Sequence, residues 1–542
     1  MLIRAKRIYL IGILFLLFQS QNVFAQSLSL EKSYLNDLYR NKQLTDSLNP
    51  NVSFTVRPIL LDSASNAALH LRKSKLILPL VVQYYNNTDH PFGINLGAMY
   101  PANGTQLYVS GGILKKYKKL TIQLQPELVY AENSNFKIFP NEHFDPIWSA
   151  YYKWYNKIDL IEKFGNKSLY TLLPGQSKIE YAFNKNYNVK ISTENEWWGP
   201  GIQQDLVLTN NANGFLHLAF QTQKPIETKF GSFEAQALIG NLQNSNIPPT
   251  YINKVFHNVF LYQPKNDEQR FITGYVLTFQ PKITKGLFLG MANASVAYYK
   301  DASNFGDYLS LQNIVNAKID DAGHRANLGS LFARYLLPES NAEVYLEYGR
   351  KDQYPTPLNL LNGQKYPRGF IAGFRRISTP TRNDLRYSIT AEIAQLDATY
   401  KDQVNNAESW YTNDYVREGY TNNGKVLGAG IGPGSTSQML DLSVLYKNSK
   451  TGLTLQRIVN NRDFYFSAYQ DYVNWKDHWV DLSATFHTYF NIKKRISIKA
   501  DLTITNSLNY NWWFIPLTDP ILPGRGYDAL NYTSHLMFVY NL

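Results

Sequence analysis

The segment Arg495–Thr505, RISIKADLTIT, alternates apolar and polar side chains without a break. Successive side chains of a β-strand point to opposite faces of the sheet, so a period of two predicts a strand with one apolar and one water-facing surface. The apolar face would carry Ile496, Ile498, Ala500, Leu502 and Ile504.

The same alternation recurs along the chain, from about Phe54 onward, between clusters of Asn, Gly, Pro and Asp. Further clear examples are residues 120–130, 343–348, 386–393, 440–446 and 480–487. Segments of about ten residues with this pattern are typical of a transmembrane β-barrel, whose lipid face is apolar and whose inner face is polar. We therefore predict an all-β fold, a large antiparallel barrel of about 18 strands formed by residues 53–542.

A soluble β-sandwich or propeller would also alternate, but two features favour the barrel. The inward faces of these strands carry charges, such as Lys499 and Asp501, which a dry core does not tolerate unpaired. The final segment, 532–542, places apolar or aromatic side chains at nearly every second position, as the closing strand of an outer-membrane barrel does.

Composition removes several classes of protein. The 542 residues include no Cys, which excludes a disulfide scaffold, a Cys-ligated zinc site, a thiol nucleophile and a lipoprotein anchor. Aromatic residues make up 14% of the chain, and Tyr and Trp are enriched at both interfaces of membrane barrels.

Residues 1–25 resemble a secretory signal peptide. Arg4, Lys6 and Arg7 precede the apolar run 8–18, and the run ends before the cleavage signal Val23-Phe24-Ala25. The apolar run is too short for a membrane-spanning helix, so we expect export and removal of this segment. Its loss would lower the formal net charge from +12 to +9. For an exported protein, an acidic polysaccharide or anionic lipid is then a better partner than nucleic acid.

Two segments have helical rather than strand spacing. Residues 26–52 predict a short N-terminal periplasmic helical segment. Residues 145–173 predict an inserted helical segment, with Pro146 at its first turn and Gly165 as a stop signal. Its aromatic stripe consists of Trp148, Tyr151, Tyr152 and Tyr155. The stripe is interpreted mainly as packing; a functional alternative is that such periplasmic helices plug one end of the barrel.

No catalytic constellation is present. The sequence contains no G-x-S-x-G, H-E-x-x-H or P-loop motif. His478 and His487 are separated by an odd number of residues and would lie on opposite faces of a strand. We therefore predict a protein that is not an enzyme and has no cofactor, metal site or catalytic residue.

Several motifs occur in a fixed order. PGQS at 174–177 is followed by ENEWWGPG at 194–201 and by LVLTNNA at 206–212; EVYLEYGRKD occupies 343–352 and GYTNNGKVLG occupies 419–428. This order resembles the Wzi capsule-assembly family of outer-membrane proteins. The resemblance implies a barrel of close to 18 strands with helices closing its periplasmic end. It also implies a lectin-like attachment point for capsular polysaccharide in Gram-negative bacteria.

The central motif has two interpretations. The candidate residues are Glu196, Trp197, Trp198, Gly199, Pro200, Gly201, Asn210 and Asn211. In the functional one, a Trp ring stacks on a sugar while Glu196 or Asn210 binds its hydroxyls. In the structural one, Gly199-Pro200-Gly201 forms a turn that the Trp pair anchors. The structural interpretation is favoured for the two Trp residues.

We therefore predict an outer-membrane protein that attaches or organises capsular polysaccharide or exopolysaccharide at the cell surface. Its expected partners are this polysaccharide and outer-membrane lipids. The alternative function is an outer-membrane channel for solutes or hydrophobic compounds, which steady conductance would reveal.

Overall fold

A computed structural model describes residues 26–45, 51–61, 77–302, 305–308, 324–351, 367–398, 408–469, 477–492, 495–515 and 525–541. The predicted signal peptide, residues 1–25, lies outside these described residues.

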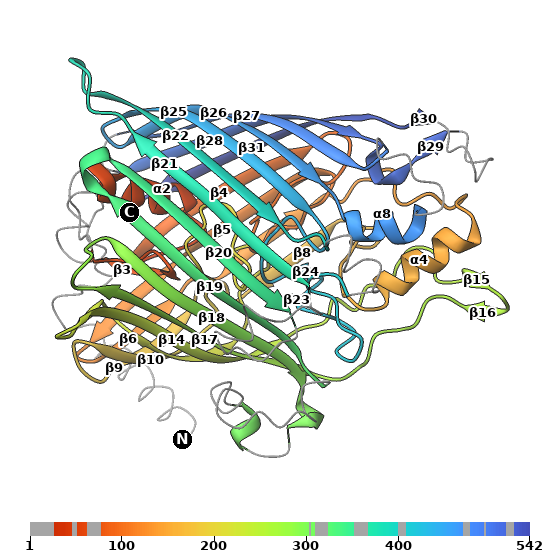
Figure 1. Cartoon of the computed structure of the whole chain (residues 1–542), viewed down its shortest axis with the longest axis horizontal. Helices are drawn as coiled ribbons and strands as arrows, with labels where there is room; N and C mark the ends of the chain where they lie inside the picture. The colour runs from red at the N-terminus through yellow and green to blue at the C-terminus, as the bar shows by residue number, and fades with distance from the viewer. Residues whose placement is uncertain are drawn as a thin grey trace, which may run out of the picture.

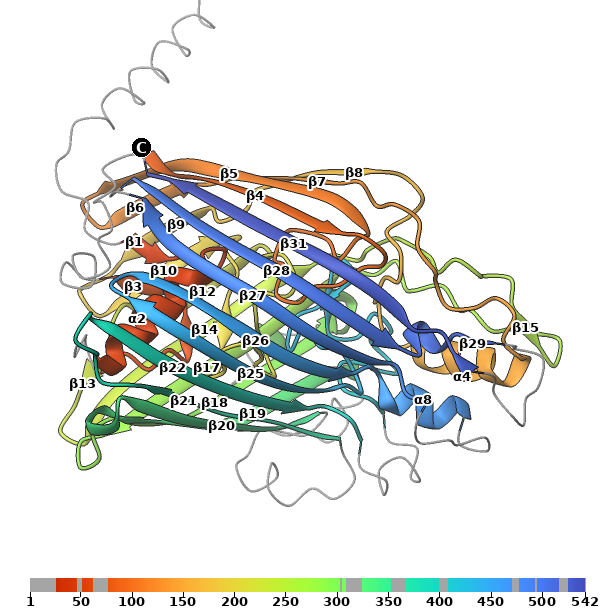
Figure 2. The same cartoon turned by 90° about the horizontal axis from the view of Figure 1, so that it is seen from above.

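The described strands close into an antiparallel barrel (Figures 1 and 2). Twenty-one hydrogen-bonded segments form eighteen strands, because β6 and β7, β8 and β9, and β12 and β13 are halves of interrupted strands. In barrel order from the closing seam, the segments are β4 (Ile77–Asn87), β5 (Gly104–Tyr117), β6 (Leu120–Leu124), β7 (Glu127–Ala131), β8 (Leu169–Leu173), β9 (Lys178–Ala182), β10 (Tyr187–Ser192), β12 (His217–Thr222), β13 (Ile226–Glu227), β14 (Gly231–Leu242), β17 (Arg270–Pro281), β18 (Leu287–Tyr298), β19 (Ala326–Leu337), β20 (Ala342–Lys351), β21 (Arg368–Ile377), β22 (Leu385–Gln395), β25 (Thr436–Tyr446), β26 (Ser449–Val459), β27 (Val480–Ile492), β28 (Ile496–Leu508) and β31 (Ala529–Tyr540). Strand β31 closes the barrel against β4, with Tyr540 opposite Leu80.

The alternation read from Arg495–Thr505 has the predicted orientation. On β28, Leu502 and Ile504 are about half exposed on the outer surface, whereas Thr503 and Thr505 are buried inside. Lys499 and Asp501 form an ion pair on the inner side. Because the outer surface has to match lipid and the lumen has to match water, the period-two pattern fixes which face is which.

The barrel wall begins at Ile77, later than the predicted boundary at residue 53. The helix α2 (Ser33–Thr45) and residues 51–61 lie inside the barrel (Figures 1 and 2). Arg40 of α2 binds Glu343 of the wall at 2.7 Å, and Asp37 binds Arg375 at 2.6 Å. Short strands continue this inner layer: β1 (Gln26–Leu28) pairs with β3 (Ile59–Leu61), and β2 (Val56–Arg57) pairs with β11 (Trp197–Trp198).

The two ends of the barrel differ. One end, the short-turn end, has tight connections between strands and carries α2 and the described C-terminal residues. The other, the long-loop end, carries the longer connections, including the hairpins β15–β16 (Val255–Phe256, Val259–Phe260), β23–β24 (Thr421–Asn422, Lys425–Val426) and β29–β30 (Phe514–Ile515, Arg525–Gly526). It also carries the 3-10 turns η1 (Tyr299–Asp301), η2 (Phe305–Tyr308) and η6 (Tyr510–Trp512), whereas η4 (Pro338–Ser340) forms a short turn. No described helix is long and apolar enough to cross a membrane.

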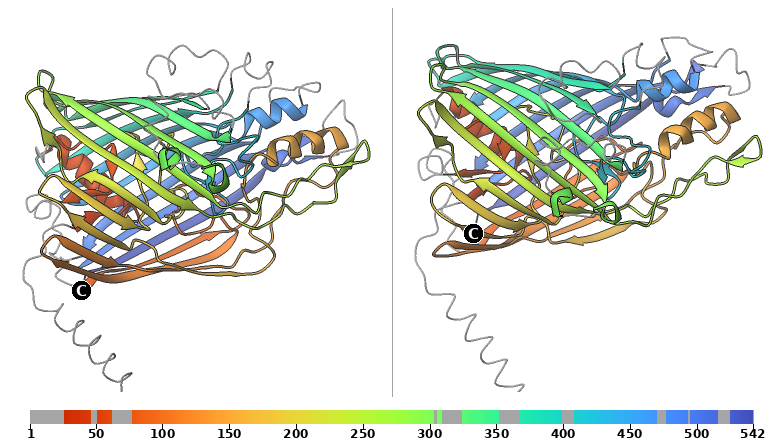
Figure 3. Two further views of the ribbon diagram at one scale, coloured as in Figure 1. Left: turned by 90° about the horizontal axis from the view of Figure 1, so that it is seen from below. Right: turned by 60° about the horizontal axis from the view of Figure 1, so that its bottom comes forward.

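The inserted helix α4 (Asp145–Tyr155) lies at the long-loop end, which corrects its predicted position as a periplasmic plug (Figure 3). Strand β7 runs away from the short-turn end, so the connection from β7 to β8 has to lie at the opposite end from α2. The helix also stops at Tyr155, ten residues before Gly165. It packs on α8 (Arg462–Tyr469) beyond the barrel rim instead of entering the lumen.

The aromatic stripe of α4 forms the core of this outer unit. Trp148, Tyr151, Tyr152 and Tyr155 are all buried, together with Phe464 of α8 and Trp512. The rings of Tyr151 and Tyr155 stack with centroids 5.4 Å apart. The stripe therefore has the packing role that was its main interpretation. Its partners belong to other long loops.

Candidate functional site: the filled lumen

The central motif lies inside the barrel. The connection 193–216 between β10 and β12 turns inward from the long-loop end and pairs with residues 55–57. The Gly199 amide donates to the Thr55 carbonyl at 3.0 Å, and the Trp198 amide donates to the Leu208 carbonyl at 3.0 Å. The motif thus adds an inner layer to the wall.

Arg57 holds the turn of the motif together. Its guanidinium donates to the carbonyl oxygens of Gly199 and Gly201 and to the Asp205 carboxylate, all at 3.0–3.1 Å. It also lies 4.2 Å from the centre of the Trp197 ring, and the Trp197 indole donates to the same carboxylate. Burial lowers the pKa of Arg57 to about 9, with Asp205 opposing the shift. The guanidinium is charged at neutral pH and neutralises the buried carboxylate.

The glycines of the motif are required by this close packing. Gly199 has a φ of +127°, and a Cβ there would overlap the Asp205 carboxylate. A Cβ on Gly201 would overlap the carbonyl oxygen of Gln204. Pro200 is buried between them, and the chain bends at Gly199 and Pro200, as the sequence Gly199-Pro200-Gly201 predicted.

Glu196 belongs to a second buried network. Its carboxylate accepts from Lys190 at 2.6 Å, from His217 at 3.1 Å and from Gln236 at 2.9 Å. Burial alone would raise the pKa of Glu196, but Lys190 and His217 lower it to about 2. Gln236 also accepts from the Trp198 indole at 2.5 Å, which ties this network to the Trp pair.

Asn210 and Asn211 join the motif to two other loops. The Asn210 side chain donates to the Asn95 backbone carbonyl at 3.2 Å, and the Asn210 backbone carbonyl accepts from the Gly97 amide at 2.8 Å. The Asn211 side chain donates to the Val426 carbonyl at 2.9 Å. Loops 88–103, 193–216 and 408–435 therefore fill the lumen as one body.

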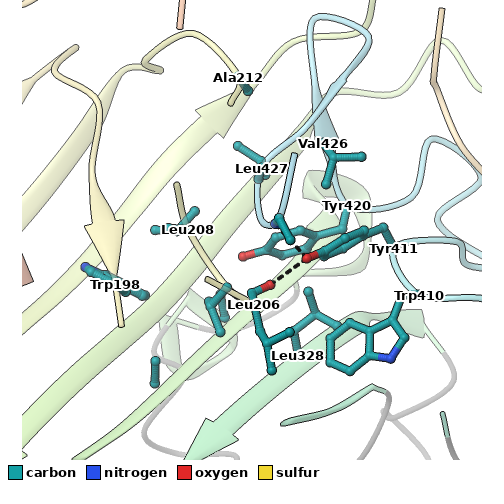
Figure 4. Packing of buried hydrophobic residues seen from close by; sticks show 14 of the residues in the cluster. Trp198, Leu206, Leu208, Ala212, Leu328, Trp410, Tyr411, Tyr420, Val426 and Leu427 are labelled. Carbon is teal, nitrogen blue, oxygen red and sulfur yellow. Dashed lines mark hydrogen bonds between the residues drawn. The ribbon is translucent and has the colours of Figure 1, made fainter. Parts of the chain in front are cut away.

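The motif GYTNNGKVLG, residues 419–428, packs directly on the central motif (Figure 4). The Tyr411 hydroxyl donates to the Leu206 carbonyl at 2.9 Å and accepts from the Ala429 amide at 2.8 Å. Lys425 donates to the carbonyls of Gly97 and Met99, and its burial lowers the pKa to about 7 despite the attraction of Glu127. The motifs spread along the sequence are thus brought together.

The structure places all eight candidate motif residues in internal contacts. Trp197 is 5% exposed and Trp198 is fully buried, so neither ring presents a face to a ligand outside the barrel. The sequence alone did not identify Arg57 and Asp205, because each is a single charged residue that no local motif singles out. Among the described residues, no group of three or more His, Cys, Asp or Glu side chains is arranged to hold a metal ion.

Some of the lumen remains open between this body and one wall. A cavity of about 410 Å³ extends from α2 to loop 88–103, and polar side chains of β25 to β28 line it. Charged or titratable lining residues include Asp37, Arg375, Asp441, Lys450, His487 and Asp501. They pair within the cavity, as Asp37 does with Lys450 at 3.2 Å and Lys450 with Asp441 at 3.1 Å.

Charge is distributed unevenly between the two ends. The described long loops contain thirteen Lys and Arg residues and twenty Asp and Glu residues. The described short turns contain ten Lys and Arg residues and three Asp and Glu residues. The positive net charge that favoured an acidic polymer is therefore concentrated away from the long-loop end.

Comparison with known proteins agrees with this architecture. The family model described as capsule assembly protein Wzi matches residues 100–514. Among solved structures, the chain resembles Wzi of Escherichia coli, an outer-membrane, carbohydrate-binding β-barrel involved in group 1 capsule assembly. The two share 13% identity at a TM-score of 0.62, over 95% of this chain and 100% of that one.

More distant barrels include OccAB2 of Acinetobacter baumannii, with 10% identity and a TM-score of 0.42 over 87% of this chain and 98% of that one. A BenF-like porin of Pseudomonas fluorescens has 8% identity and a TM-score of 0.41 over 87% of this chain and 99% of that one. No curated protein matches the sequence.

Proposed function

Because the chain belongs to the capsule assembly protein Wzi family, we propose that it attaches or organises capsular polysaccharide or exopolysaccharide at the cell surface. It is an outer-membrane β-barrel. We propose a lectin-like, non-catalytic role. The observation that supports this most is that the chain's own loops fill the lumen around the family motif. A long polymer then has to bind outside, on the long-loop end, which faces the cell exterior in barrels of this kind.

We propose that the outer unit, formed by α4, α8 and the hairpin β15–β16, contributes to the contact surface (Figure 3). Phe260 is 65% exposed, and Tyr262 is partly exposed with its ring 5.9 Å from that of Tyr152. Aromatic rings supply large rigid contact area at low entropic cost. Because acidic side chains outnumber basic ones at this end, we expect recognition through ring faces and hydroxyl groups rather than net positive charge.

The test is binding of purified surface polysaccharide from the same bacterium to the purified full-length protein. In the variant Phe260→Ser/Tyr262→Ser, we expect the Kd to rise about tenfold, since each aromatic contact contributes about 0.5–1.5 kcal/mol. Added salt should change the wild-type Kd little, because screening weakens only charge attraction.

Phe230→Ser is the matched control, since Phe230 is also an exposed Phe but lies at the short-turn end. An equal loss of binding in this control would contradict the proposed surface.

In cells, a deletion strain should release polysaccharide into the medium. Normal cell-bound polysaccharide in that strain would overturn the proposed function.

A further inference from the structure

The basic short-turn end contains a continuous group of lysines, which we call the lysine arc. It occupies four successive connections around the rim, those joining β5 to β6, β9 to β10, β12 through the short strand β13 to β14, and β17 to β18. Its members are Lys118, Lys119, Lys185, Lys224, Lys229, Lys282 and Lys285. Glu227 is the acidic residue of these turns. Among the described residues, none of the seven lysines has a carboxylate partner.

The turns of the arc are bound to one another, so the lysines form one surface. Lys119 donates through its ammonium to the Phe183 carbonyl at 2.9 Å, which joins the first turn to the second. The Lys282 amide donates to the Phe230 carbonyl at 2.8 Å, which joins the third turn to the fourth. Seven positive charges held on a rigid rim, with Glu227 as the one negative charge of the same connections, create a strong local positive field.

Each turn of the arc also exposes one large apolar side chain next to its lysines. These are Tyr117 at 43% exposure, Phe183 at 47%, Phe230 at 80% and Ile283 at 96%. Tyr117 and Phe183 continue the outward rows of their strands, two or four residues beyond other exposed side chains such as Tyr181 and Ile113. Tyr117 and Phe183 thus belong to the lipid-facing surface rather than to the lumen.

We propose that the lysine arc binds the headgroups of anionic phospholipids in the periplasmic leaflet, with the four apolar side chains inserted at the acyl boundary. Short turns of outer-membrane barrels face the periplasm. Aromatic rings settle at the headgroup level of a membrane, and nearby lysines are attracted to anionic lipid. A soluble acidic partner would not account for apolar side chains that continue the lipid-facing rows. This proposal depends on the outer-membrane location and not on the polysaccharide.

Native mass spectrometry of the full-length protein tests the proposal. The protein is released from mixed micelles of phosphatidylglycerol and phosphatidylethanolamine, and the ratio of the two retained lipids is measured. We expect wild type to enrich phosphatidylglycerol and Lys229→Gln/Lys282→Gln/Lys285→Gln to lower that enrichment at least tenfold. The matched control, Arg382→Gln/Lys447→Gln/Arg495→Gln, removes three charges from the rest of the same rim and should retain the enrichment.

Equal enrichment in the lysine variant and wild type would overturn the proposal, as would an equal loss in the control. A second variant, Phe230→Ser/Ile283→Ser, separates lipid from other anions. It should retain less of both lipids, whereas unchanged retention would contradict insertion at the membrane. Displacement of phosphatidylglycerol by excess inorganic phosphate would likewise identify a simple phosphate site and overturn a lipid surface.

Discussion

Replacing Arg57 by methionine should lower the free energy of unfolding by about 3–5 kcal/mol, the usual cost of removing one partner from a buried ion pair. The substitution removes the donor to Gly199, Gly201 and Asp205 at once, together with the cation over the Trp197 ring. The Asp205 carboxylate would then be buried without its cation. The lumen-filling loop should detach even if the barrel wall still forms.

Urea titration of the folded protein in lipid vesicles, followed by tryptophan fluorescence and gel mobility, measures this loss. The double variant Arg57→Met/Asp205→Asn should recover part of the stability, because it removes the unpaired charge as well. Arg376→Met, which truncates an exposed arginine at the rim, is the control and should change the midpoint little. If Arg57→Met unfolds like this control, Arg57 does not hold the motif.

Replacing Glu343 by glutamine should release α2 from the lumen and also cost about 3–5 kcal/mol. Glu343 is fully buried and binds two guanidinium groups, Arg40 of α2 at 2.7 Å and Arg334 of the wall at 2.6 Å. Without its charge, two buried cations lose their shared partner. Trypsin should then cleave α2 after Arg40 much faster than in the wild type, because the helix spends more time outside the barrel.

Glu339→Gln is the matched control, since Glu339 is an exposed carboxylate in the turn before β20. Equal trypsin resistance of Glu343→Gln and this control would show that other contacts are enough to hold α2.

The same preparations test the alternative function in planar bilayers. The wild type, closed by α2 and by the loops around the motif, should pass no steady current; steady conductance would favour a solute channel.

The predictable part of the candidate site was its turn chemistry. Gly199, Pro200 and Gly201 indicated a turn, and the chain bends at Gly199 and Pro200, because the conformations of glycine and proline are local properties. The partners of the turn were not predictable. Arg57 lies more than 140 residues before Asp205 in the sequence, and no local pattern connects an isolated arginine to a distant carboxylate.

The sequence by itself determined the barrel and its lipid-facing surface, because alternation follows directly from strand geometry at each position. It also identified both main helical segments, since helical periodicity is local. Only the tertiary structure decided which end each helix occupies, which loops fill the lumen and where the positive charge gathers. Those properties depend on the direction of each strand and on contacts between distant residues. The alternation in Arg495–Thr505 therefore predicts a wall, whereas the assembled chain determines what that wall encloses.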